Sequence, residues 1–66
     1  MKAYRVLVHD LRERAPIELT AELASDARAN EFARERLASS ASYMAIEVWR
    51  GEVKLLHLRS GLRVAA

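Results

Sequence analysis

Two histidines and one aspartate are the residues of this chain whose types could do chemistry together. His9 and Asp10 are adjacent, and His57 lies near the opposite end of the chain. If the segments that carry the two histidines formed neighbouring strands, two imidazoles and a carboxylate could bind zinc or share a proton. Their spacing matches no metal-binding or catalytic signature, and histidines at strand ends are common as plain surface residues. We therefore expect no catalytic residue, no metal site and no cofactor.

The serines and glycines offer no recognisable site either. The serines lie where helix caps and turns are expected, and none follows a nucleophile-elbow pattern. Two glycines are too few for a phosphate-binding loop. A chain of 66 residues also has little length for both a hydrophobic core and a substrate pocket. The sequence therefore predicts a protein that is not an enzyme and that has no small-molecule substrate.

The composition favours a small soluble protein of the cytoplasm. The net charge of +2 is too small to argue for nucleic-acid binding by itself, and the lack of cysteine excludes disulfides and thiolate metal sites. No apolar run approaches the ~20 residues that span a bilayer. The start of the chain, "MKAYRVLVHD", lacks the apolar segment of a secretion signal. We expect no association with membranes.

The strands that must position these side chains are indicated by β-branched and aromatic residues. Residues 4–9 read as a first strand, and residues 43–49 and 53–59 read as a hairpin around Gly51. Residues 17–23, "IELTAEL", are ambiguous because they alternate with a period of two and are also rich in helix-forming residues. A helix would scatter their apolar side chains around its axis, so we favour a strand.

A helix is expected over residues 26–39, "DARANEFARERLAS". Ser25 or Asp26 can cap its first turn. Its apolar side chains fall on one side of the helical projection and comprise Ala29, Phe32, Ala33 and Leu37. The order of elements predicts an α+β fold of the ββαββ type, a four-stranded, mostly antiparallel sheet with one helix packed on one face. We expect a single domain over residues 1–60 and a frayed tail over residues 61–66.

One helix can cover only one side of a sheet, so the other side must be polar or find a partner. Which side chains lie there depends on the loop around Gly51, since a slip of one residue exchanges the two faces of the last strand. The helix-facing side of the preceding strand would hold Met44, Ile46 and Val48. A three-residue loop aligns these with Leu56 and Leu58, whereas an even loop aligns them with Val53, Leu55 and His57.

We favour the three-residue loop, because such loops commonly end with a glycine in the left-handed region. This register turns Lys54 toward the helix and Val53 and Glu47 away from it. The uncovered face then mixes aliphatic, aromatic and basic groups that a monomer would seldom leave exposed. The predicted interface residues are Arg5, Leu7, His9, Trp49, Leu55, His57 and Arg59.

Three kinds of partner suit such a face. A second copy of the chain is the first, with Leu7, Leu55 and Trp49 as anchors, because a small sheet with one bare apolar face usually needs burial. A different protein is the second. Single-stranded nucleic acid is the third, with Trp49 stacking on bases and the basic side chains contacting phosphates. Those basic side chains would be Arg5, Arg59 and Arg63. We expect a homodimer.

The segments "AYRVLVHD" and "IEVWRGEVKLLHL" together resemble small uncharacterised bacterial proteins. These short ββαββ proteins are frequent in alphaproteobacteria, and their last hairpin carries a hydrophobic–Glu–hydrophobic–Trp–x–Gly pattern, which residues 46–51 match here. The first loop departs from the resemblance, since "LRERAP" stands where an Asp-Gly-type turn is expected. The resemblance implies the fold and no particular function.

Overall fold

The structure, a computed structural model, describes residues 1–61, so the predicted frayed tail lies outside the described residues except for Gly61. The elements follow in the order β1 (Lys2–Asp10), β2 (Ile17–Leu23), α1 (Asp26–Ala38), β3 (Tyr43–Arg50) and β4 (Val53–Arg59). The predicted α+β class and the ββαββ order are therefore confirmed.

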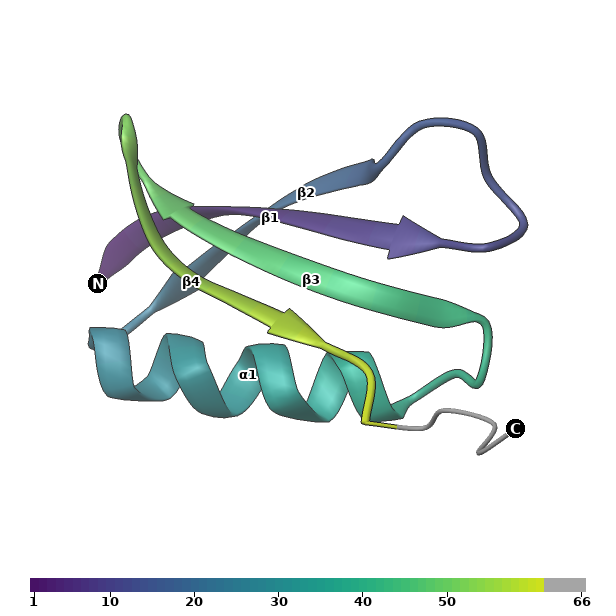
Figure 1. Cartoon of the computed structure of the whole chain (residues 1–66). Coiled ribbons are helices and arrows are strands. Elements are labelled where there is room, and N and C mark those ends of the chain that lie inside the picture. The colour runs from purple at the N-terminus through teal and green to yellow at the C-terminus, as the bar shows by residue number, and fades with distance from the viewer. Residues whose placement is uncertain (62–66) are drawn as a thin grey trace.

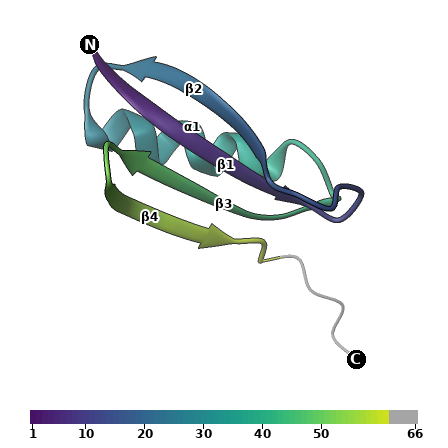
Figure 2. The ribbon, with the colours of Figure 1, turned by 90° about the horizontal axis from the view of Figure 1, so that it is seen from above.

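The four strands form one sheet in the order β2-β1-β3-β4, and each neighbouring pair is antiparallel. Helix α1 crosses one face of this sheet, and no other element of residues 1–61 covers the opposite face (Figures 1 and 2). The ambiguous segment is a strand, as predicted, and pairs along β1 with Leu19 opposite Val6. The strict alternation of apolar and polar residues favours the strand over a helix, because it puts every apolar residue of β2 on the helix side of the sheet.

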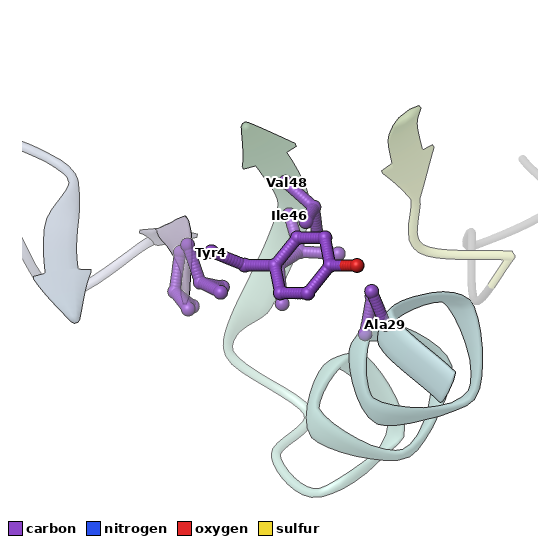
Figure 3. Packing of buried hydrophobic residues seen from close by; sticks show 7 residues of the cluster. Tyr4, Ala29, Ile46 and Val48 are labelled. Carbon is purple, nitrogen blue, oxygen red and sulfur yellow. The ribbon is translucent and has the colours of Figure 1, made fainter. Parts of the chain in front are cut away.

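The core lies between the sheet and α1. Figure 3 shows Tyr4, Ile46 and Val48 packed around Ala29 of the helix. Small alanines on this helix face let α1 approach the sheet closely, and the β-branched residues suit the pleated surface opposite. The fully or almost fully buried residues are Tyr4, Val6, Val8, Ala29, Ala33, Ile46 and Val48.

The start of α1 is held both locally and from the sheet. Ser25 is the N-cap, and its hydroxyl accepts a 3.2 Å hydrogen bond from the backbone N–H of Arg28. The hydroxyl of Tyr4 donates a 2.6 Å bond to Asp26, and the guanidinium of Arg50 lies 3.0 Å from the same carboxylate. The bond from Tyr4 is the main cause that lowers the pKa of Asp26. These contacts fix the helix relative to β1 and β3.

The loop of the last hairpin differs from its prediction. Arg50 pairs with Val53, so the loop has two residues, Gly51 and Glu52, rather than three. Gly51 does have the predicted positive φ, of 61°, but stands at the first loop position. Glycine there, followed by a residue with negative φ, fits a type II′ hairpin turn.

A β-bulge in β4 reverses the effect of the shorter loop. Val48 pairs with Leu56 and Trp49 pairs with Lys54, so Leu55 is the extra residue. Beyond the bulge, Leu56 and Leu58 face the helix and His57 faces away, as predicted. Between the loop and the bulge, at residues 53 and 54, two predictions are wrong. Lys54 lies on the uncovered side opposite Trp49, and Val53 lies opposite Arg50, which reaches the helix.

Leu55 itself also departs from its prediction. The two residues at the wide side of a bulge project to roughly the same side of the sheet, and both Leu55 and Leu56 pack against the buried core. Leu55 was expected on the uncovered face.

A second bulge lies at the other end of β3. His9 pairs with Ala45 and Asp10 pairs with Tyr43, which leaves Met44 as the extra residue. Met44 is 51% exposed. It was predicted to face the helix, so that prediction is wrong as well.

Candidate protein-interaction surface

The uncovered side of the sheet, here called the outer face, faces the viewer in Figure 2, with α1 behind it. It consists of side chains that alternate with the buried ones along each strand. By the register of the sheet they are Glu18, Thr20 and Glu22 of β2, Arg5, Leu7 and His9 of β1, Ala45, Glu47 and Trp49 of β3, and Lys54, His57 and Arg59 of β4.

Glu47 is the centre of a hydrogen-bond network on this face. Its side chain is only 15% exposed. One carboxylate oxygen accepts a 3.0 Å bond from the indole Nε1 of Trp49, and the other accepts a 2.8 Å bond from His9 Nε2. Lys54 Nζ lies 3.8 Å away. Glu47 therefore joins side chains from three adjacent strands.

The charge of Glu47 is stabilised by these partners. The bond from Trp49, then the bond from His9, hold the pKa of Glu47 below its ordinary value, against the opposing effect of partial burial. Its carboxylate is ionised at neutral pH, so it accepts from both donors at once. That fixes the indole in one orientation.

Two cations flank the indole ring of Trp49. The guanidinium of Arg5, from β1, and the ammonium of Lys54, from β4, each lie 5.5 Å from the ring centroid. This distance is within the range of cation–π attraction. Trp49 is half-buried by these neighbours, although no helix within residues 1–61 covers this face.

The two histidines do not form the joint site considered from the sequence. Strand β3 lies between β1 and β4, so His9 and His57 are on opposite sides of it. Within residues 1–61, no group of three His, Cys, Asp or Glu side chains is placed to hold a metal ion.

Asp10 is engaged elsewhere. It is 5% exposed and accepts bonds from the backbone N–H and the guanidinium of Arg12, at 2.9 Å each. These bonds lower the pKa of Asp10 to about 2, the side-chain bond contributing most. Asp10 therefore holds the turn after β1 and is not available to the histidines.

A shallow hollow of about 320 Å³ lies at the Ala45 end of the outer face. It is open because the small side chain of Ala45 stands between longer ones. The hollow is lined by His9, Met44, Ala45, Glu47, His57 and Arg59. The bulge at Met44 contributes an exposed apolar side chain to its rim.

The structure brings together the predicted interface residues with one exception. Arg5, Leu7 and Trp49 lie side by side, and His57 and Arg59 extend the same face along β4. Leu55 is the exception, because the bulge turns it toward the core. Arg63, proposed from the sequence as a nucleic-acid contact, lies outside the described residues.

The sequence did not predict the central role of Glu47 in the hydrogen-bond network or the outward position of Lys54. Glu47 was placed on this face but not among the predicted interface residues. A signal for the bulge was present in the adjacent apolar pair Leu55–Leu56, which breaks the alternation of β4.

Comparisons with family models, with curated proteins and with solved structures found no match to this chain. The resemblance to small bacterial ββαββ proteins stays a prediction. Among the described residues, α1 is the one helix, and it is neither long nor apolar enough to cross a membrane.

Proposed function

We propose that this protein is a non-enzymatic association domain of the cytoplasm that forms a homodimer through its outer face. The observation that carries the proposal is the ordered cluster around Trp49 on a sheet face that no element of residues 1–61 covers. Aromatic and arginine side chains in such settings commonly dominate binding energy.

The fixed side-chain conformations of the cluster around Trp49 favour binding. Trp49 is held by Glu47 and flanked by Arg5 and Lys54, so its rotamer is fixed before a partner arrives. Association then costs less side-chain entropy than it would for a free side chain. Leu7, half-buried beside Glu47, supplies an aliphatic surface next to the indole.

The size of the face supports a weak dimer. Strands spaced about 4.8 Å apart, with about seven residues each at about 3.4 Å, give a four-stranded face of roughly 450 Å² in projection. Two such faces bury about 900 Å², which is below the 1,200 Å² of a standard interface. We therefore expect a dissociation constant in the micromolar range or weaker.

Single-stranded nucleic acid remains the alternative partner, and the geometry favours it less. Base stacking needs an accessible ring face, and Arg5 and Lys54 lie over the ring of Trp49. Both cations also have carboxylates close by, Arg5 at 3.9 Å from Glu18 and Lys54 at 3.8 Å from Glu47. Binding to an oligonucleotide that weakens steeply with salt would favour this alternative over the homodimer.

Static light scattering over a concentration series tests the proposal. We expect the mass to rise from the 7.5 kDa of one chain toward twice that value between about 10 µM and about 1 mM. A mass that stays at 7.5 kDa over the whole range would overturn the homodimer.

Trp49→Ala locates the interface. We expect it to weaken the dimer at least about tenfold, as loss of a central aromatic anchor does. Leu11→Ala is the matched control, because Leu11 is an apolar residue that is 68% exposed in the turn after β1, away from the outer face. Circular dichroism checks that each variant is folded, and Leu7→Ala replaces Trp49→Ala if the latter unfolds. A dimer that is equally stable in both variants would place the interface elsewhere.

A further inference from the structure

The two edges of the outer face carry opposite charge. Along β2, the outward residues are Glu18, Thr20 and Glu22. Along β4, they are Lys54, His57 and Arg59. The side chains of Glu18 and Lys54 are 58% and 43% exposed, so their charges are accessible to a partner. Between the two edges, the guanidinium of Arg5 lies 3.9 Å from Glu18, and Glu47 is hydrogen-bonded to His9.

This pattern distinguishes between the ways in which two copies can meet. In a symmetric face-to-face dimer, a two-fold axis running across the strands places β2 over β2 and β4 over β4, so like charges meet on both sides. A two-fold axis parallel to the strands exchanges the edges and places β2 of each copy over β4 of the other. Like charges that meet across an interface repel each other, so the second arrangement is favoured.

We propose that the homodimer has its two-fold axis parallel to the strands, with the acidic edge of each copy over the basic edge of the other. This inference rests on the proposed homodimer and specifies its partner surface. The rotation of about 30° between packed sheets does not change which edges meet.

The register of the sheet identifies facing residues. Glu18 pairs with Leu7, Leu7 with Glu47, and Glu47 with His57, so Glu18 and His57 share one row across the sheet. Exchange of the edges brings Glu18 of one copy over His57 of the other. By the same reasoning, Thr20 faces Lys54 of the second copy, because both share the row of Arg5 and Trp49.

Crosslinking between single-cysteine variants tests the arrangement, since the native chain contains no cysteine. Glu18→Cys protein is mixed with His57→Cys protein and treated with a bismaleimide that spans about 10 Å, the spacing of packed sheets. Light scattering first establishes that the mixture dimerises. We expect the mixture to crosslink at least fivefold more than either variant alone. Thr20→Cys mixed with Lys54→Cys should give the same result.

The outcomes separate this inference from the proposed function. A monomeric native protein overturns both. A dimer in which Glu18→Cys crosslinks with itself as well as in the mixture has β2 over β2, which overturns the inference and leaves the homodimer intact. A dimer that crosslinks in neither case does not use the outer face in this way, and it overturns the inference too.

Charge reversal gives an independent readout of the same arrangement. In the proposed dimer, β2 of each copy lies over β4 of the other. The double variant Glu18→Lys, Glu22→Lys therefore brings positive charges together at both edges, and we expect the dissociation constant to rise at least about tenfold. Adding Lys54→Glu and Arg59→Glu to the same chain restores opposite edges and should recover the dimer. A dimer that is unaffected by the first pair of substitutions would contradict the proposed arrangement.

Discussion

The indole Nε1 of Trp49 donates a 3.0 Å hydrogen bond to the carboxylate of Glu47, two residues earlier on the same strand and the same face. The second oxygen of Glu47 accepts from His9 on β1. One glutamate thus orients the largest side chain of the outer face and connects it to the neighbouring strand. An outward-facing glutamate, which would ordinarily be plain solvated surface, is here part of the structure of the face.

Glu47→Gln should lower the free energy of unfolding by about 1–2 kcal/mol at pH 7, because hydrogen bonds to a charged acceptor become bonds to a neutral one. The lower part of the usual range applies, since His9 and Lys54 are 34% and 43% exposed and solvent weakens their interactions with Glu47. Urea unfolding at low protein concentration measures the difference. A decrease in the free energy of unfolding of less than about 0.3 kcal/mol would contradict the central role that we assign to Glu47 in the network.

The effect of Glu47 should depend on pH in a defined direction. Its pKa in the folded protein lies below the ordinary value of 4.5, so its stabilisation is fully present above pH 4.5 and is lost as the pH falls through the lowered pKa. The native protein and the Glu47→Gln variant should therefore converge in stability in acid. Urea unfolding repeated at decreasing pH would show this, and a difference that stays constant would count against it.

Asp10 should titrate at lower pH than an ordinary aspartate. Its pKa is lowered from 3.8 to about 2 by Arg12, so its stabilisation persists below pH 3.8 and disappears near pH 2. The carboxyl carbon shift of Asp10, followed by NMR, should have a midpoint of about 2. In Arg12→Ala the midpoint should rise part of the way toward 3.8, because the backbone N–H of residue 12 can still donate. An unchanged midpoint in that variant would show that the guanidinium is not the cause.

Gly51→Ala should destabilise the protein by about 1–2 kcal/mol, the cost of a left-handed conformation for a residue with a Cβ. Gly51 has a φ of 61°, and an added Cβ would meet no atom within 4 Å, so the cost is one of backbone conformation alone. Gly61→Ala is the matched control, because its added Cβ also meets nothing and its φ is outside the left-handed range. Thermal unfolding of the two variants compares them, and equal stability would contradict the left-handed conformation of Gly51.

Leu55→Ala distinguishes a core position from an interface position. Leu55 packs against the core, so we expect a loss of about 1–2 kcal/mol in the free energy of unfolding, less than for a fully buried leucine. The dimer constant should change less than about threefold. The exposed Leu11→Ala serves as the control for stability, with an expected change within about 0.5 kcal/mol. The reverse pattern, a stable monomer and a weakened dimer, would place Leu55 on the outer face.

The sequence alone determined the elements of this protein and the side of the sheet on which most residues lie. Alternation in β1 and β2 and the helical spacing of Ala29, Ala33 and Leu37 depend on local backbone geometry, so they can be read without knowledge of the fold. The same local rules give the uncovered face, because one helix cannot cover both sides of a sheet.

Only the tertiary structure decided the register of the last hairpin and the contacts of the outer face. Two bulges, at Met44 and Leu55, each add one residue to a strand, and their positions depend on pairing with β1 and β3 rather than on local preference. They turn Met44 outward and Leu55 inward, against the predicted alternation. The bond between Glu47 and His9 joins residues 38 positions apart in the chain, so it exists only because β3 pairs with β1 in this register.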